Sequence, residues 1–205
     1  MTNEHHHSHQ DHSYCDIEMP HHHHDFGKSS EQRDKLEAGK KVLTIRSHSG
    51  LAGDMFLCGL IRTLGLSSQE TDNILNGIFP ALKGSVQLVK KEVNHIAGWH
   101  CSVQLPHEHQ HRNLDDVLKI ISQAQLSEKA KSYAVSAFSF VAEAEAAVHS
   151  LNIEEVHFHE VGALDSILDI CFTCELFARL NPDYFVVSPL PIADGVIHCA
   201  HGAIP

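Results

Sequence analysis

The chain has 205 residues, with 15 Lys or Arg against 26 Asp or Glu, and therefore a formal net charge of −11. This length is enough for one domain with its own hydrophobic core. The acidic balance argues against a nucleic-acid binder, which needs a basic surface, and no apolar run reaches the roughly 18 residues of a membrane span. Twenty histidines point instead to metal ions.

Residues 1–25 form a histidine-rich segment with nine imidazoles, five carboxylates and no Lys or Arg. Because the segment has little apolar surface to bury, we expect a disordered tail that continues through a polar linker to residue 40. An expression tag is one interpretation. A native metal-binding tail is favoured, because Ser8, Gln10 and residues 13–20 interrupt the histidine runs. Imidazole binds zinc, copper, nickel and iron alike, so the tail does not name its metal.

From residue 41 onward, hydrophobic periodicity predicts intermixed strands and helices. The expected strands lie at 41–46, 85–93, 98–105, 184–188 and 196–199. The expected helices lie at 55–64, 68–79, 114–124, 127–149 and 168–180. The longest helix carries a predicted core-facing stripe of Ala130, Tyr133, Ala134, Ala137, Phe138, Val141, Ala144 and Val148. The mixture indicates an α/β or α+β class, with a mixed sheet and packed helices.

The cysteines give no sign of a disulfide framework, because all six are widely spaced except Cys171 and Cys174. No Lys or Arg precedes Lys28 and no apolar leader is present, so we expect a cytoplasmic location. The C-x-x-C pair falls in an expected helix, where zinc or redox chemistry is possible. We favour two small buried side chains, since no second pair completes a zinc site.

A glycine-rich turn, Ser49-Gly50-Leu51-Ala52-Gly53, links the first expected strand to the first expected helix. Gly50 and Gly53 allow the backbone to approach a ligand, and the N–H groups that open a helix bind anions such as phosphate. The turn lacks the Gly-Lys-Ser/Thr of a P-loop. The spacing favours Asp54 as a helix N-cap, although a metal ligand or base stays open.

The segment His157-Phe158-His159-Glu160 is the densest polar group of the chain. In extended backbone the two imidazoles point to one side and Phe158 points to the other, toward a core. Two imidazoles beside a carboxylate make part of a transition-metal site, which Asp165 and Asp169 can complete or orient. A polar turn whose histidines bond to the backbone is an equally good interpretation.

A second alternating group, His107, His109 and His111, follows Pro106 and would present three imidazoles on one side of an extended loop. A solvated loop is the alternative. The remaining histidines of the folded part stand alone, and each alone is more often a hydrogen-bonded histidine than a ligand.

From about residue 42 to residue 205 the chain resembles the LarC family of nickel insertion proteins. The resemblance is carried by residues 49–55 (SGLAGDM), 143–149 (EAEAAVH), 154–170 (EEVHFHEVGALDSILDI), 188–191 (SPLP) and 200–202 (AHG) with Pro205. It implies that the protein binds Ni²⁺ and inserts it into pyridinium-3,5-bisthiocarboxylic acid mononucleotide. The product is the nickel-pincer cofactor of lactate racemase-type enzymes, made by chelatase or cyclometallase chemistry of the lyase class.

By this resemblance we expect the substrate phosphate at Ser49, Gly50 and Gly53. A nickel–carbon bond forms only if a ring proton leaves, and we expect Glu160 or His159 to accept that proton. Asp54 is a further catalytic candidate. The expected metal ligands are His157, His159, Glu160, Asp165, His107, His109 and His111.

The family's chains continue through a proline-rich stretch into a second half associated with CTP and a divalent cation. We therefore expect a tail and linker at 1–40 and an N-terminal nickel-binding domain at 41–205, incomplete without that half. The expected partners are a separate second half and the enzyme that receives the cofactor. His48 stands where members commonly carry an aromatic residue, and Asn113 interrupts the usual Arg-His-Leu.

Two other functions stay open from the residues alone. One is a nickel buffer or metallochaperone that does no chemistry. The other is a metal-dependent hydrolase built on His157, His159 and an aspartate.

Overall fold

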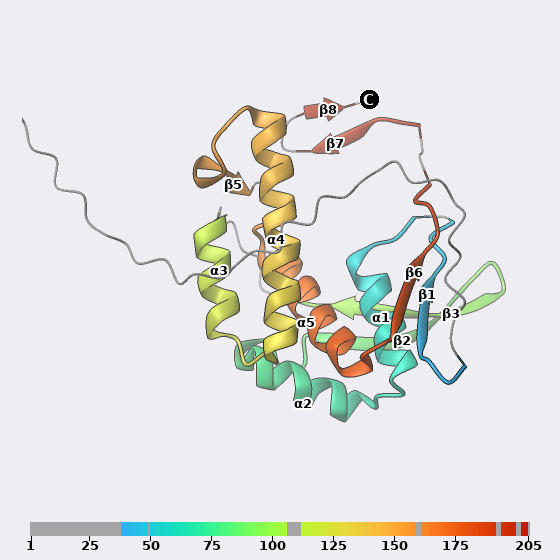
Figure 1. Cartoon of the computed structure of the whole chain (residues 1–205). Helices are drawn as coiled ribbons and strands as arrows, with labels where there is room; N and C mark the ends of the chain where they lie inside the picture. The colour runs from blue at the N-terminus through green and yellow to red at the C-terminus, as the bar shows by residue number, and fades with distance from the viewer. Residues whose placement is uncertain are drawn as a thin grey trace, which may run out of the picture. The chain divides into compact units, whose positions relative to one another are not determined.

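The computed structural model describes residues 38–48, 50–105, 112–158, 161–191, 194–199 and 202–204, all within a unit formed by residues 38–205 (Figure 1). The expected disordered tail lies outside the described residues, except for its last three. Within the described part of the chain, no helix is long and apolar enough to cross a membrane.

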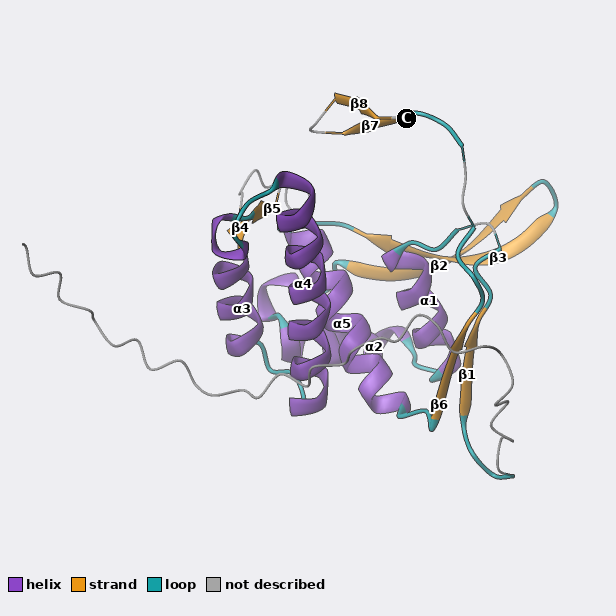
Figure 2. Cartoon of the chain, turned by 45° about the horizontal axis from the view of Figure 1, so that its top comes forward, coloured by secondary structure: helices purple, strands orange, loops and turns teal. Residues whose placement is uncertain are grey.

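Five α-helices dominate the fold, as the sequence predicts (Figures 1 and 2). They are α1 (Gly53–Thr63), α2 (Ser68–Ile78), α3 (Leu114–Gln123), α4 (Glu128–His149) and α5 (Leu164–Leu180). Two 3₁₀ turns accompany them, η1 (Pro80–Leu82) and η2 (Ile153–Glu155). Ser67 and Asn113 open α2 and α3 with reciprocal capping boxes, which satisfy the first free N–H groups of each helix.

The described residues also form eight short strands: β1 (Val42–Ile45), β2 (Val86–Val93), β3 (Ile96–Val103), β4 (Arg112–Asn113), β5 (His157–Phe158), β6 (Tyr184–Val187), β7 (Ile197–Cys199) and β8 (Gly202–Ile204). Parallel and antiparallel pairs both occur, which confirms the mixed α/β class. The described strands form four two-stranded sheets, β1–β6, β2–β3, β4–β5 and β7–β8, where we expected one mixed sheet. Helix α1 packs against both β3 and α5, and among the described strands the β2–β3 hairpin pairs with no other strand.

The β2–β3 hairpin turns more tightly than expected. Asn94 and His95 have φ of 50° and 64°, the left-handed conformation that a two-residue turn between twisted strands requires. The strands therefore extend to Val93 and from Ile96.

The hydrophobic core lies among α1, α4 and α5, and its largest fully buried side chains include Leu57, Phe138, Phe158, Phe172 and Leu176. In α4 the buried line is Ala130, Ala134, Phe138 and Ala142. Tyr133, Ala144 and Val148, which we placed in this stripe, are exposed, Val148 by 80%. Val148 lies in the last turn of α4, beyond Ala142, the last residue of the buried line.

The C-x-x-C pair lies inside α5. Cys171 is fully buried and Cys174 is half-buried. Burial raises the pKa of each thiol to about 12, so both stay protonated and neutral. This bears out the interpretation of two packed side chains.

Candidate functional site

The loop after β1 is held at the carboxyl ends of two parallel strands. The N–H of Ser188, just after β6, donates to the Ile45 carbonyl at 2.9 Å. The Ser188 hydroxyl accepts the N–H of Ser47 at 2.9 Å. Gly50 adopts φ of 92°, and its N–H donates to the Ser47 carbonyl at 3.1 Å. The glycine turn thus follows the end of β1, the edge where parallel sheets bind ligands. Ser49 lies outside the described residues.

Helix α1 begins at Gly53, two residues earlier than the N-cap prediction for Asp54 requires. Ala52, with extended backbone, occupies the N-cap position and offers no side-chain oxygen. Asp54 is instead the second helical residue, and its Oδ1 accepts the N–H of Met55 at 2.8 Å. The N-cap interpretation is therefore wrong. The carboxylate lies in the first turn, where the helix dipole stabilises negative charge.

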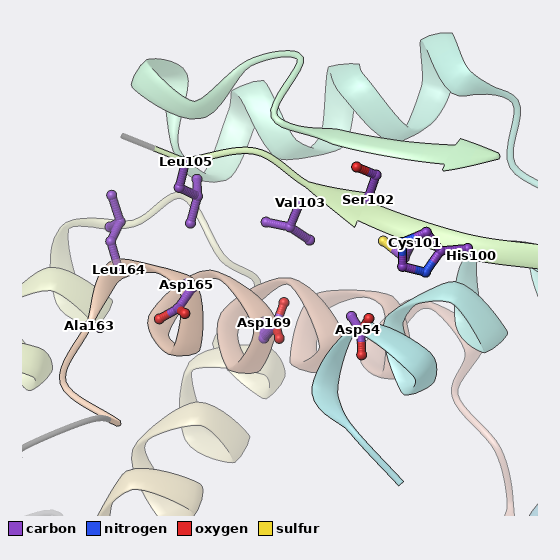
Figure 3. Close-up of a pocket in the computed structure, with 10 residues that line it drawn as sticks. All are labelled: Asp54, His100, Cys101, Ser102, Val103, Leu105, Ala163, Leu164, Asp165 and Asp169. Carbon is purple, nitrogen blue, oxygen red and sulfur yellow. The ribbon is translucent and has the colours of Figure 1, made fainter. Parts of the chain in front are cut away.

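A cleft of about 520 Å³ lies between the start of α1, strand β3 and the start of α5 (Figure 3). Its lining includes three aspartates, and none of the described lining residues is Lys or Arg. A cleft with this charge attracts cations and repels free anions. The lining residues are Asp54, His100, Cys101, Ser102, Val103, Leu105, Ala163, Leu164, Asp165 and Asp169.

Gly53 sets the width of the cleft floor. A Cβ at Gly53 would lie 2.6 Å from Oδ2 of Asp169 and 3.2 Å from its Cβ, too close for an unstrained contact. The glycine therefore lets α1 approach α5 and places the Asp54 and Asp169 carboxylates in one cleft. Asp165 and Asp169 lie one turn apart on α5, as predicted.

Asp169 is the most perturbed carboxyl of the cleft. Burial, and then the negative charges of Asp54 and Asp165, raise its pKa from the usual 3.8 to about 6. Its Oδ1 is buried and has no hydrogen-bond partner within the described part of the chain. A carboxyl in this state exchanges a proton near neutral pH and gains stability from a bound cation.

Replacing Asp169 by Asn should raise the free energy of unfolding at pH 7.5 by about 1–2 kcal/mol. A pKa shift of about two units corresponds to about 3 kcal/mol, which partial solvent exposure reduces. Because the folded pKa is raised, wild-type stability falls as pH rises from about 4 to 6, so the advantage of the variant should vanish at pH 4. Urea unfolding of both proteins across this range measures the difference.

The matched control for this prediction is Asp194→Asn, which removes an exposed carboxylate that does not line the cleft. It should change stability by less than about 0.5 kcal/mol at either pH. An Asp169→Asn variant less stable than wild type at pH 7.5 would show that the carboxylate is stabilised in the fold.

The sequence analysis missed two lining residues, His100 and Cys101, on β3. Cys101 is 2% exposed, and burial is the main cause that raises the pKa of its thiol to about 12. His100, the residue before Cys101, is exposed. A single histidine next to a cysteine in a strand does not match the residue spacing of a metal-ligand motif. Only the packing of β3 on α1 shows that both residues line the cleft.

The residues directly after the first histidine segment pair with the first two residues of the second. Arg112 pairs with Phe158 and Asn113 pairs with His157 in the β4–β5 sheet. The Arg112 guanidinium also donates from Nη1 to the Gly162 carbonyl at 2.7 Å. Phe158 is 1% exposed and in the core, while His157 is exposed, which confirms the alternation predicted for them. His157 is not among the described residues that line the cleft.

Besides Ser49, five predicted site residues lie outside the described residues: His107, His109, His111, His159 and Glu160. Among the residues that the structure describes, no three His, Cys, Asp or Glu side chains are grouped closely enough to hold a metal ion. The predicted coordination set thus stays a prediction. His149, expected to be satisfied within the protein, forms an ion pair with Glu145 at 3.2 Å.

A cleft lined by three aspartates and a histidine is suited to metal cations. The chain belongs to the nickel insertion protein family, whose model matches residues 43–205. It is 40% identical over 165 residues to a protein of Dictyoglomus thermophilum that is named for nickel insertion, covering 80% of this chain and 42% of that relative.

Two further relatives are named as pyridinium-3,5-bisthiocarboxylic acid mononucleotide nickel insertion proteins. The protein of Staphylococcus epidermidis is 33% identical over 80% of this chain and 41% of its own length. That of Geobacillus kaustophilus is 34% identical over 80% of this chain and 42% of its own length. The chain therefore spans about two fifths of the curated relatives that it matches. No solved structure is similar to it.

Proposed function

We propose that this chain binds Ni²⁺ and takes part in its insertion into pyridinium-3,5-bisthiocarboxylic acid mononucleotide. The observation that supports the proposal is the acidic cleft, because residues that adjoin both histidine segments in the sequence line it. Leu105 and Ala163 line the cleft. His107 follows Leu105 by two residues, and Glu160 precedes Ala163 by three. The β4–β5 pair adds a second connection between the same two segments.

In this proposal the aspartates of the cleft attract Ni²⁺, and imidazoles complete its coordination, since nickel accepts both donor types. The ligands are Asp165 and the histidine segments, namely His157, His159, Glu160, His107, His109 and His111. The nickel is the cargo of the reaction.

The substrate phosphate is placed at the glycine turn of Ser49, Gly50 and Gly53, beside the N–H groups that open α1. The Gly50 N–H itself holds the turn through the Ser47 carbonyl. The Asp54 carboxylate at the start of α1 repels this phosphate unless a cation lies between them. We therefore infer that nickel binds first and that the substrate enters afterwards, with Asp54 on the cleft side of the metal.

Formation of the nickel–carbon bond requires one ring C–H bond to break. The electron pair of that bond passes to nickel, and the proton passes to the Glu160 carboxylate or the His159 imidazole. The Asp169 carboxylate can accept the proton in a later transfer, because its pKa is raised toward neutral pH. The activity is thus a chelatase or cyclometallase reaction of the lyase class.

The resemblance to the family also suggests roles for the tail, for the folded domain and for the rest of the family's chain. Residues 1–40 serve as a metal-collecting tail and linker, and 41–205 as the nickel-binding domain. The remainder of the family's chain supplies the steps that use CTP with a divalent cation, and a nickel-pincer enzyme receives the product in the cytoplasm.

A nickel titration separates insertion from simple buffering. We expect the full chain and a variant lacking residues 1–30 to share one tight site, while the variant loses most of the weaker sites contributed by nine imidazoles. His157→Ala with His159→Ala should abolish the tight site, and His95→Ala, an exposed histidine of the hairpin, should not. Isothermal calorimetry measures both.

Other outcomes identify the alternatives. Loss of all nickel binding with residues 1–30 supports a buffer or metallochaperone. Turnover of phosphate esters without the pincer precursor supports a metal-dependent hydrolase. Nickel incorporation into the precursor, with the second half of a family member supplied separately, tests insertion itself.

A further inference from the structure

Helix α4 carries apolar side chains on two sides, roughly 120° apart around its axis at 100° per residue. One side is the buried line that faces the core. The other side carries an outer stripe spaced alternately by four and three residues: Tyr133, Ala137, Phe140, Ala144, Ala147 and Leu151, the last just beyond the helix end. Phe140 is 62% exposed, and Leu151 is 48% exposed. At one end of the stripe the Tyr133 ring packs edge-on against Phe177 of α5, with ring centroids 5.6 Å apart. Phe140, Ala144 and Ala147 are exposed, and a continuous exposed apolar stripe marks an interaction surface.

The spacing of the outer stripe is that of a helix–helix seam. Alternating steps of four and three give the average period of 3.5 residues that lets one helix keep contact with another along its length. A loop or a flat surface does not require this period. The stripe therefore calls for another helix as its partner.

We propose that the outer stripe joins two copies of this chain, with their α4 helices packed antiparallel about a twofold axis level with Ala142. Such an axis makes an interface self-complementary, so each residue meets the one equally far from Ala142 on the other side. Phe140 then meets Ala144, Ala137 meets Ala147, and Tyr133 meets Leu151. Each large ring meets a smaller side chain, as close packing requires.

The charges at the two ends of α4 match the same arrangement. Lys129 and Lys131 lie in its first turn, and Glu154 and Glu155 follow its last turn. Antiparallel packing places the ammonium groups of one copy level with the carboxylates of the other. Parallel packing would instead place Phe140 on Phe140 and like charges together. The acidic and histidine-rich residues 1–25 offer no helix of matching apolar period.

One residue opposes the pairing. Glu143 is exposed and lies beside the stripe, one position from the axis, so the two copies bring their Glu143 carboxylates onto the same flank. Like charges at this separation repel. Replacing Glu143 by Gln should therefore tighten the dimer, an effect that no structural role within one copy produces.

Sedimentation velocity of the 205-residue chain across 1–100 μM tests the proposal. We expect wild type to sediment with the mass of two chains, Phe140→Glu to raise the dissociation constant at least 100-fold, and Glu143→Gln to lower it about threefold or more. Ile96→Glu is the matched control, because Ile96 is 76% exposed at the hairpin tip and its change adds the same charge. Far-ultraviolet circular dichroism shows that each variant is folded.

Disulfide trapping tests the direction of the helices. The double variant Ala137→Cys, Ala147→Cys should form linked dimers under mild oxidation, while each single variant should match wild type, whose own cysteines set the background. Linked dimers from the single variants in equal amount would indicate parallel helices and overturn the pairing. A wild-type monomer at 100 μM, or a Phe140→Glu dimer of unchanged affinity, would overturn the proposal.

Discussion

Replacing Phe158 by Ala is expected to lower the free energy of unfolding by about 3–5 kcal/mol, the usual loss for a buried ring. Phe158 is 1% exposed, and its ring centroid lies 6.2 Å from that of Phe138 on α4. Strand β5 has two residues, so this ring is its main anchor to the core. Urea unfolding followed by circular dichroism, at one fixed protein concentration, measures the loss.

Phe158→Leu separates the loss of volume from the loss of the aromatic ring. It keeps an apolar group in the same space and should cost no more than about 1.5 kcal/mol. Nickel affinity should follow the same order, because Phe158 lies between the two histidines that it positions. A loss below 1 kcal/mol for the alanine variant would mean that β5 is held by other contacts.

Replacing Glu160 by Gln is expected to lower the rate of nickel insertion by about 10²–10⁴-fold, the typical contribution of a general base. Gln keeps the size and an oxygen donor of the side chain but does not accept a proton. Nickel affinity should therefore change by less than about threefold, because several other ligands remain. The assay follows the nickel–pincer product by mass spectrometry, with the second half of a family member supplied.

Glu128→Gln is the control for this experiment, since Glu128 is a surface carboxylate that pairs with Lys131 at 3.6 Å. It should leave both insertion and binding unchanged. Full insertion activity in Glu160→Gln would remove Glu160 from the mechanism and leave His159 as the acceptor. Lost nickel binding in the same variant would make Glu160 primarily a ligand.

Local sequence signals were enough to predict all five helices and the hairpin, because their causes are local. Ser67 and Asn113 are capping residues beside apolar periodic runs, and Pro80 ends the run before it. The pairing of strands was not predictable in this way. β1 pairs with β6, about 140 residues further along, and nothing near either strand specifies the partner.

The site was predictable only as separate pieces. The spacing of Asp165 and Asp169 placed them on one helix face, and alternation placed Phe158 in the core. That Asp54 shares a cleft with Asp169 depends on the contact at Gly53, which is tertiary. His100 lines the cleft because β3 packs on α1, which is likewise a tertiary contact that the local sequence does not specify.

The β4–β5 pair has a consequence for metal affinity. It ties Arg112, which directly follows the 106–111 segment, to Phe158, the second residue of the other histidine segment. Once one segment holds an ion in the proposed way, donors of the other meet it at a high effective concentration, and each added ligand closes only a short loop. Chelation is then cooperative without a rigid cage, and an ion held by both segments leaves only after both release it.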